Sequence, residues 1–429
     1  MRWLQQAMET HREGRVHEAQ QQYEQAFALD PDDPDVRHMY GVLMASLARF
    51  EQAAEHIARA VELKPGVAIF HNNLGNAYMQ LGRLDDAELQ YRQAIILDSD
   101  RIDAMNNLGV LLGRRGQHAD AEKVFRRLVE LVPKFSDARQ NLAQLYITMG
   151  RISDAVQQCA EGLVTAPHNR GLRHVLGLAY GALGWVDEAR ELYRKWLEED
   201  PTDVRACHHY AAYTGEAVPE VASPDYVRAT FDNFADGFES KLAELGYRAP
   251  SLVGGALALA LGAPQAALRI ADAGCGTGLC AAYLRPYARE LVGVDLSRPM
   301  LERAVVKQAY DELRQGDLVE FLQSRPRNFD AVVSADTLCY FGVIDGFAQA
   351  ARQSLAEGGW LVFTVEALDD DAAEPPWRLQ THGRYSHRRA YVEHALAAAG
   401  FGPPRIEPVV LRNENQKPVA GWLVVASTC

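Results

Sequence analysis

The chain has 429 residues, of which 48% are hydrophobic, and this length allows two or three domains with a sizeable core. Its formal charge of −13 disfavours a broad nucleic-acid surface, and the sequence lacks the run of about 18 apolar residues that a membrane span requires. The polar start does not resemble a signal peptide, and the six cysteines are scattered. We therefore expect a cytoplasmic protein with reduced thiols and no nucleic-acid or membrane partner.

The first half of the chain repeats itself every 34 residues. Four kinds of position recur at this spacing. The prolines are Pro31, Pro65, Pro133, Pro167 and Pro201, and the turn glycines are Gly82, Gly116, Gly150 and Gly184. The two sets of small residues are Gly41, Gly75, Gly109, Ala143 and Gly177, and Ala19, Ala53, Ala87, Ala121, Ala155 and Ala189. Six units and a capping helix, Val204 to Tyr213, fit residues 1–213 without an insertion. The pattern resembles tetratricopeptide repeats, which implies an all-α superhelix with a concave face.

Three asparagines occupy the same position in successive repeats: Asn73, Asn107 and Asn141. An amide side chain both donates and accepts hydrogen bonds, so a row of amides can pair with the backbone of an extended peptide. The row resembles the asparagine ladder in the repeats of O-linked N-acetylglucosamine transferases, which implies a protein or peptide partner on the concave face. In the alternative interpretation the asparagines bond only to neighbouring repeats or to water.

A polar segment with two prolines, residues 214–224, follows the repeats and predicts a linker. Beyond it, residues 225–429 alternate between strand and helix patterns. Strands are expected over residues 268–274, 290–297, 329–336, 360–367, 405–412 and 420–427. This order favours an α/β domain with a mostly parallel sheet that ends in a hairpin.

A glycine turn, Gly274-Cys275-Gly276-Thr277-Gly278, joins the first of these strands to a helix. Such a turn lets backbone N–H groups approach a ligand closely, and the helix N-terminus adds partial positive charge. The spacing differs from the dinucleotide fingerprint and so disfavours a pyrophosphate. Asp295, 21 residues after Gly274, is placed to accept ribose hydroxyls, and Asp317 is placed to accept an adenine amino group.

The motifs D-x-G-C-G-T-G, V-D-L-S-x-x-M-L and G-D-L resemble those of class I S-adenosylmethionine-dependent methyltransferases, close to the ubiquinone-biosynthesis type. The resemblance implies a Rossmann-like domain that binds S-adenosyl-L-methionine and releases S-adenosyl-L-homocysteine. It implies cofactor contacts by Asp272, Gly274, Gly276 and Gly278 at the methionine end, Asp295 at the ribose, Met300 on the adenine, Asp317 and Leu318 at its edge, and Ala335 and Asp336 facing the methyl group, with Cys275, Thr277 and Leu296 completing the set. The alternative is an ordinary tight strand-to-helix turn.

The order of repeats and α/β domain resembles a group of bacterial predicted methyltransferases that contain tetratricopeptide repeats. This resemblance implies no particular substrate. In the segment that leads into the α/β domain, Val227, Phe231, Phe234 and Phe238 fall on one face of a helix. That face either covers the cofactor or simply packs on the sheet. Tyr340, beyond the fourth strand, is a further candidate for the wall of the substrate site.

Candidates for a general base lie in the segment "THGRYSHRRAY", which also contains His382 and Tyr391. We expect His387 to act as base or substrate anchor, with Tyr385 and Arg384 positioning an acid or carbonyl group. A histidine with no role in catalysis is the alternative. The Asn/Asp-Pro-Pro-Tyr pattern of enzymes that methylate amide or base nitrogens is missing from "ADTLCYFG", which disfavours those acceptors. Cys275 and Cys280 lack the second pair of ligands that a metal site needs, so no metal is expected.

Three hypotheses follow for the function of the chain. The first is an S-adenosylmethionine-dependent methyltransferase whose repeats recruit a protein or peptide substrate, or a carrier of the substrate. The second is a small-molecule O-methyltransferase whose repeats only dock it to other proteins. The third is a scaffold that binds the cofactor without turnover, which the acids beside the glycine turn disfavour.

Overall fold

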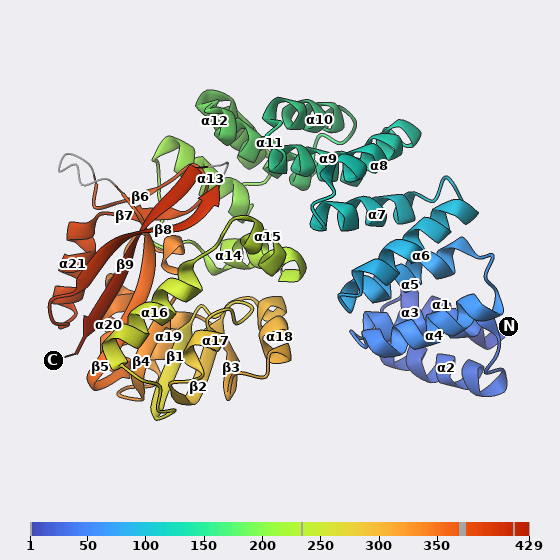
Figure 1. Ribbon diagram of the computed structural model, residues 1–429. Coiled ribbons are helices and arrows are strands. Elements are labelled where there is room, and N and C mark those ends of the chain that lie inside the picture. The colour runs from blue at the N-terminus through green and yellow to red at the C-terminus, as the bar shows by residue number, and fades with distance from the viewer. Residues whose placement is uncertain (1, 233–234, 369–374, 415–416, 429) are drawn as a thin grey trace. The chain divides into compact units, whose positions relative to one another are not determined.

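A computed structural model describes residues 2–232, 235–368, 375–414 and 417–428 of the chain. The chain divides into two compact units, Met1–Ala179 and Tyr180–Cys429 (Figure 1). No helix in the described part of the chain is both long and apolar enough to cross a membrane.

The first unit consists of antiparallel helix pairs. Its helices are α1 (Arg2–Arg12), α2 (Val16–Leu29), α3 (Pro34–Ser46), α4 (Phe50–Leu63), α5 (Ala68–Gln80), α6 (Leu84–Leu97), α7 (Ile102–Arg114), α8 (His118–Leu131), α9 (Ser136–Thr148), α10 (Ile152–Thr165) and the start of α11 (Arg170–Leu183). The turn glycines Gly82, Gly116 and Gly150 take φ values of 70°, 72° and 74° just after α5, α7 and α9. They are C′ glycines, as predicted, because this left-handed conformation carries a steric penalty for a residue with a Cβ.

The small residues of the repeat allow the two helices of each pair to approach closely. A Cβ added to Gly75 would lie 2.6 Å from the ring of Tyr91, and one added to Gly109 would lie 2.6 Å from the ring of Phe125. Both rings are almost completely buried. The repeat pattern therefore specifies the packing of each helix pair as well as its turn.

The second unit contains an α/β sheet. Its helices are α12 (Val186–Glu199), α13 (Val204–Thr214), α14 (Pro224–Phe231), α15 (Phe238–Glu244), α16 (Ala249–Leu261), α17 (Ala281–Leu284), α18 (Arg298–Val306), α19 (Leu318–Gln323), α20 (Asp345–Ser354) and α21 (Arg389–Ala398), with 3-10 turns at Ala235–Gly237 and Leu338–Tyr340. Its strands are β1 (Leu268–Ala273), β2 (Ala288–Asp295), β3 (Glu312–Gln315), β4 (Phe329–Ser334), β5 (Leu355–Ala367), β6 (Trp377–Leu379), β7 (Tyr385–His387), β8 (Arg405–Glu414) and β9 (Lys417–Ser427).

The core of the sheet is parallel in the order β3-β2-β1-β4-β5. The hairpin of β8 and β9 extends it antiparallel to β5, and β7 joins the end of β5 with β6 beside it. The chain order reverses between β1 and β4, which is where ligands bind in doubly wound sheets. The predicted fold class is confirmed, whereas the three short strands β3, β6 and β7 were not anticipated.

Helices cover both faces of this sheet (Figure 1). Helices α16 and α17 pack on one face through Val253, Leu257 and Leu284. Helices α19, α20 and α21 pack on the other, where Phe321 and Phe347 are buried. Because both faces are covered, the strands carry continuous apolar runs, and polar side chains collect at the strand ends.

The segment predicted as a linker, residues 214–224, is instead bonded to a loop of the sheet. The amides of Gly342 and Val343 both donate to the carbonyl of Glu220 at 2.8 Å, and Ala222 N donates to Tyr340 O at 2.8 Å. Val221 and Phe341 form an antiparallel bridge. Residues 219–222 thus act as a short extra strand beside the loop that follows β4. The local sequence does not predict this pairing.

Helix α13, predicted as the cap of the repeats, also packs within the second unit. His208 Nε2 lies 2.9 Å from the carbonyl oxygen of Gly383, and the imidazole stacks on Tyr226 of α14 with 3.8 Å between ring centroids. The boundary of the compact units accordingly falls inside α11, ahead of the expected boundary at 213.

Candidate functional site

The glycine turn leaves the carboxyl end of β1. Gly274, Gly276 and Gly278 have φ values of 79°, 53° and 84°. A Cβ at Gly274 would lie 2.2 Å from Thr337 Oγ1, and one at Gly278 would lie 2.9 Å from the ring of Tyr310. Glycine is therefore required at these two positions both by the backbone conformation and by the lack of space.

Asp272 lies beneath the turn with only 1% of its surface exposed. Its Oδ2 accepts a 2.6 Å hydrogen bond from the hydroxyl of Tyr310, whereas Oδ1 has no partner among the described residues. Burial raises the pKa of Asp272 to about 7. Thr277, within the turn, is equally buried, and its hydroxyl also lacks a partner among the described residues. Buried polar atoms without partners are uncommon in folded proteins, and these two lie at the turn where the sequence predicts a ligand.

Asp295 ends β2 and ties it to the turn. Its Oδ2 accepts from Gly276 N at 2.8 Å, and its Oδ1 accepts from Ser297 N at 2.9 Å. Burial raises the pKa of Asp295, and these two N–H groups oppose that shift. The hydroxyl of Ser297 in turn donates to Asp232 at 2.7 Å, so a side chain at the end of α14 reaches the same site.

The residues expected around the adenine lie at the starts of two helices. Met300 and Leu318 are buried at the starts of α18 and α19. Asp317 is the N-cap of α19, where its Oδ1 accepts from Val319 N and Glu320 N at 2.8 and 3.0 Å. Leu296 directly follows Asp295. The adenine contacts themselves stay a prediction.

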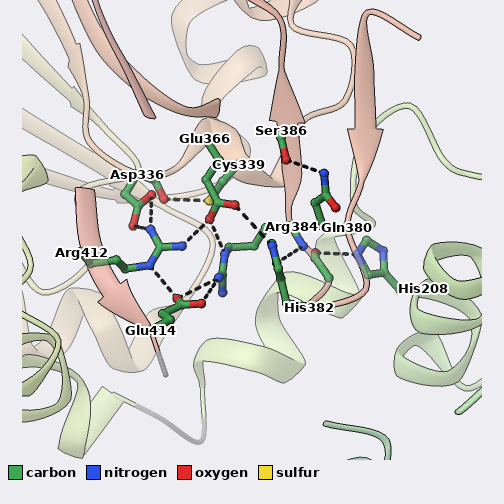
Figure 2. A network of polar contacts seen from close by, with 11 residues as sticks. His208, Asp336, Cys339, Glu366, Gln380, His382, Arg384, Ser386, Arg412 and Glu414 are labelled. Carbon is green, nitrogen blue, oxygen red and sulfur yellow. Dashed lines mark hydrogen bonds and ion pairs between the residues drawn. The ribbon is translucent and has the colours of Figure 1, made fainter. Parts of the chain in front are cut away.

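Asp336 follows β4 and Ala335 with an unusual backbone, because its φ is 55°. Its carboxylate forms a two-point ion pair with Arg412 of β8, at 2.9 and 2.7 Å. Arg412 also donates to Glu366 at the end of β5 and, at 2.7 Å, to Glu414. The predicted methyl-facing carboxylate is thus part of a larger ion network (Figure 2).

Arg384, which was predicted to position an acid or carbonyl group, belongs to the same network and pairs with carboxylates of the chain itself. Its guanidinium donates to Glu366 at 2.6 Å and to both oxygens of Glu414 at 2.8 and 2.6 Å. Burial alone would raise the pKa of Glu366, but Arg384 and Arg412 lower it to about 2. The carboxylate is therefore ionised throughout the physiological range.

The placement of His387 disfavours its predicted role as a general base or substrate anchor. The residue has no exposed surface, and its Nε2 lies 3.1 Å from the carbonyl oxygen of Gly342. Burial lowers its pKa to about 4. Tyr385 is also fully buried, and its hydroxyl donates to Pro219 O at 2.7 Å. The physical reason is that this segment forms β7, a short strand inside the unit, rather than an open loop.

Aromatic side chains lie beside the glycine turn. Phe231 contacts Phe238 and Tyr340 with ring centroids 6.0 and 5.5 Å apart. Phe238 is also the nearest side chain to the position of a Cβ on Gly276, at 4.0 Å. Phe234 lies outside the described residues. The prediction of one continuous helix is wrong, because Phe231 ends α14 and Phe238 begins α15, and Phe238 is the member of the predicted face that reaches the turn.

The three asparagines of the row bond to polar side chains of the preceding repeat rather than to one another. Asn107 Nδ2 donates to Asn72 Oδ1 at 3.1 Å and to Asn76 Oδ1 at 2.9 Å, and Asn141 Nδ2 donates to Asn106 Oδ1 at 2.9 Å. The amide of Asn73 pairs with His38 Nε2, at 2.9 Å. This is the contact between neighbouring repeats that the alternative interpretation expected, although it leaves acceptor capacity on the amide oxygens.

A hollow of about 360 Å³ lies beside this row. It is lined by Ala45, Phe50, Asn76, Ala77, Met79, Gln80, Tyr91, Asn107, Val110 and Arg114. The hollow thus combines apolar walls with amide groups and one arginine.

Sequence reasoning missed Tyr310, Glu366, Arg412 and Glu414. Glu366 carried a usable signal, because an acid at the end of a long apolar strand must find a partner when it is buried. Tyr310 and Arg412 carried none, since their partners are 38 and 76 residues away in the chain.

Residues 271–363 match a family model described as a methyltransferase domain. Tetratricopeptide repeat models match residues 45–102 and 72–138, residues 11–72 and 114–170, and residues 171–203. The chain therefore carries a methyltransferase domain, as its glycine turn and sheet order indicate. Its first half carries tetratricopeptide repeats, and the methyltransferase domain lies in its second half.

Several known proteins resemble parts of the chain. Over 144 residues it is 37% identical to methyltransferase-like protein 27 of Homo sapiens, covering 33% of this chain and 54% of that protein. Over 101 residues it is 35% identical to a malonyl-(acyl-carrier protein) O-methyltransferase of Enterobacter lignolyticus, covering 24% of this chain and 40% of that protein. The solved structure of PilW, a type IV pilus biogenesis factor, shows a TM-score of 0.44 at 22% identity, over 47% of this chain and 93% of PilW. The chain thus spans about half or less of the length of these two curated relatives.

Proposed function

We propose that the protein is an S-adenosylmethionine-dependent methyltransferase. The observation that carries the proposal is the unpartnered Oδ1 of Asp272, buried beneath a glycine turn at the point where the strand order reverses. A cationic ligand would supply the partner that this oxygen lacks. The methyltransferase relatives support the same assignment.

The residues present fit this cofactor in chemistry. Asp272 would accept a hydrogen bond from its ammonium group, Asp295 would accept from its ribose, and Met300 and Leu318 would pack on its adenine. When bound, the cofactor supplies a methyl group activated by a sulfonium. The chain's task is then alignment and exclusion of water, to which Phe231, Phe238 and Tyr340 contribute.

The environment of the expected catalytic residues bears on the acceptor. His387 and Tyr385 are buried and bonded to backbone carbonyls, and Arg384 is held by two carboxylates. A nucleophile that must lose a proton would gain no help from these three groups. We therefore propose an acceptor that is anionic before it reacts.

Calorimetric titration of S-adenosylmethionine tests the proposal. We expect Asp295→Asn to weaken binding at least tenfold, or about 1.4 kcal/mol, because the carboxylate both holds the turn and faces the ligand. Glu320→Gln, an exposed acid in the first turn of α19, serves as the control and should bind as the unaltered chain does. The proposal is wrong if the unaltered chain does not bind the cofactor, or if Asp295→Asn binds it equally well.

We further propose that the repeats recruit the substrate as a protein, a peptide or a group on a carrier protein. The hollow beside Asn107 and Arg114 supports a peptide, and one relative acts, by its name, on an acid bound to a carrier protein. The asparagines of the row already bond to side chains of neighbouring repeats, and this favours the second candidate, in which the repeats only dock a small-molecule O-methyltransferase to other proteins.

Labelling with methyl-labelled S-adenosylmethionine in a cell lysate separates the two candidates. If the repeats recruit a protein substrate, label enters macromolecules, and the double variant Asn107→Ala, Arg114→Ala reduces it several-fold. Label in the small-molecule fraction, unchanged in this variant, would support docking instead. Binding of the cofactor without release of S-adenosylhomocysteine would indicate a scaffold.

A further inference from the structure

Five charged side chains meet where several strands end at the carboxyl edge of the sheet (Figure 2). Asp336 follows β4, Glu366 lies at the end of β5, Arg384 precedes β7, and Arg412 and Glu414 lie on β8. The cluster adjoins the proposed cofactor site, because Thr337, next to Asp336, donates to the carbonyl of Gly274 at 3.2 Å. Charged groups gathered at this edge lie where doubly wound sheets bind ligands.

The cluster has a buried part and a more open part. Arg412 and Glu366 have side chains that are only 3% and 4% exposed, whereas Arg384 is 19% and Glu414 is 28% exposed. Glu414 is thus the carboxylate most open to solvent. Displacement or substitution of Glu414 therefore disturbs the other four charged side chains least.

The charges of the cluster do not balance. Two guanidiniums face three carboxylates, so Asp336 and Glu366 already neutralise Arg384 and Arg412. Glu414 adds a surplus negative charge in a partly buried place, where an extra charge is costly. Glu414 supplies acceptors for Arg412 Nε and Arg384 Nη2, and an anion from a ligand could supply the same acceptors.

Glu414 is held as a bound carboxylate ligand would be. Its Oε1 accepts from Arg412 Nε at 2.7 Å and from Arg384 Nη2 at 2.8 Å, and its Oε2 accepts from Arg384 Nη2 at 2.6 Å. Two planar guanidiniums that share one carboxylate form a geometry specific for that group.

We propose that Glu414 occupies a carboxylate-binding position, and that the methyl acceptor carries a carboxylate that replaces Glu414 on Arg384 and Arg412. The inference rests on the proposed function, since it names the substrate class for that site. The exchange of one carboxylate for another leaves the net charge of the partly buried cluster unchanged. A carboxylate-bearing acceptor also agrees with the anionic acceptor proposed above.

Titration of succinate into the full-length chain tests the inference. Glu414→Gln empties the position of its charge while keeping the shape of the side chain. We expect succinate to bind this variant at least tenfold more tightly than the unaltered chain, because it no longer competes with Glu414. Glu407→Gln, which removes an exposed carboxylate from the same strand, is the matched control and should bind as the unaltered chain does.

A second substitution separates the site from general charge effects. Arg384→Lys, added to Glu414→Gln, should abolish the gain, because the single ammonium group of lysine cannot hold Glu366 and a second carboxylate together, as Nε and Nη2 of Arg384 do. Succinate should also raise the thermal midpoint of Glu414→Gln more than that of the unaltered chain. This second measurement reports folding of each variant as well as binding.

Two results would overturn the inference. One is a Glu414→Gln variant that stays folded and binds succinate no more tightly than Glu407→Gln. The other is a gain that survives Arg384→Lys. Each titration is run with and without S-adenosylhomocysteine, so that failure to bind this nucleoside counts against the proposed function while the succinate result still decides the carboxylate site.

Discussion

At the scale of single residues, Tyr310 links several features of the cofactor site. Its hydroxyl donates to Asp272, and its ring occupies the space that a Cβ on Gly278 or Gly293 would need, at 2.9 and 3.0 Å. One side chain therefore holds the acid and accounts for the glycine at 278. It also adds to the crowding at Gly293 in β2, where Leu313 Cδ2 and Cys275 Sγ lie nearer still, at 2.7 and 2.9 Å. No motif marks Tyr310, because its importance arises from where the chain folds back.

The first prediction concerns the pH dependence of cofactor binding. Burial raises the pKa of Asp272 to about 7, and the hydroxyl of Tyr310 opposes that rise. A cationic ligand prefers the ionised acid, so affinity should increase as the pH rises through about 7. Tyr310→Phe should raise the pKa further and weaken binding at pH 7 several-fold, with recovery at higher pH. Titration calorimetry between pH 6 and 9 measures this.

Tyr287→Phe is the control for this prediction, because the hydroxyl of Tyr287 bonds to Gly262 O, away from the turn.

The raised pKa of Asp272 also affects folding. Since the folded pKa lies above the unfolded value, the acid's contribution to the free energy of unfolding is complete below about pH 4 and is lost as the pH rises through about 7. Asp272→Asn should remove this dependence. Equal pH profiles for Tyr310→Phe and the unaltered chain would contradict the assignment.

The second prediction concerns His387. We expect His387→Gln to lower the free energy of unfolding by about 1–3 kcal/mol, because a buried hydrogen bond to Gly342 O is weakened. The pH profile of methyl transfer should keep its shape, since a histidine with a pKa near 4 stays neutral over that range. Denaturant unfolding and pH–rate measurements check the two parts. Loss of a titration near neutral pH would restore His387 as a base.

At the scale of elements, two glycines of one repeat helix have different structural roles. Helix α7 contains Gly109 at the contact with Phe125 and Gly113 near its end, where a Cβ would meet nothing within 4 Å. Spacing in the repeat separates the two, because only Gly109 recurs at the position of close approach. The first glycine stabilises the packing, whereas the second only weakens the helix.

The third prediction uses this matched pair. Gly109→Ala should destabilise the chain by about 1–3 kcal/mol, since the new methyl group overlaps the ring of Phe125. Gly113→Ala should be neutral or should stabilise it by up to about 1 kcal/mol through helix propensity. Unfolding of both variants in urea measures the difference. Effects of the same sign and size would show that the close approach is not as described.

At the scale of the whole molecule, the second unit begins before the methyltransferase sequence motifs. Its aromatic cluster joins Tyr193 and Trp196 of α12 to Tyr213 of α13, and α13 contacts the 383 loop through His208. Residues 219–222 then pair with the loop after β4. The methyltransferase unit thus incorporates helices that the sequence assigns to the repeats.

The fourth prediction concerns truncation. A chain that begins at Val186 should fold with a stable second unit, whereas one that begins at Pro224 should lose about 2–5 kcal/mol, because it lacks the backbone bonds of residues 219–222 and the packing of α13. Thermal unfolding followed by circular dichroism compares the two. Equal midpoints would mean that the last repeat helix, the cap and the linker are independent of the α/β domain, as the sequence suggested.

The sequence by itself determined the parts of this protein that depend on local spacing. The repeat period specified the helix pairs and their turn glycines, and alternating apolar strands and helices specified the α/β class, because both patterns describe neighbours in the chain. The order of Asp272, the glycine turn and Asp295 predicted the proposed cofactor site for the same reason.

Only the tertiary structure decided which charges and rings meet. Arg412 pairs with Asp336 across 76 residues, and His387 is buried because β7 pairs with β5, contacts that no local pattern encodes. The free energy of a buried ion or imidazole depends on its partners in space. The role of such a residue is therefore set by the fold that surrounds it.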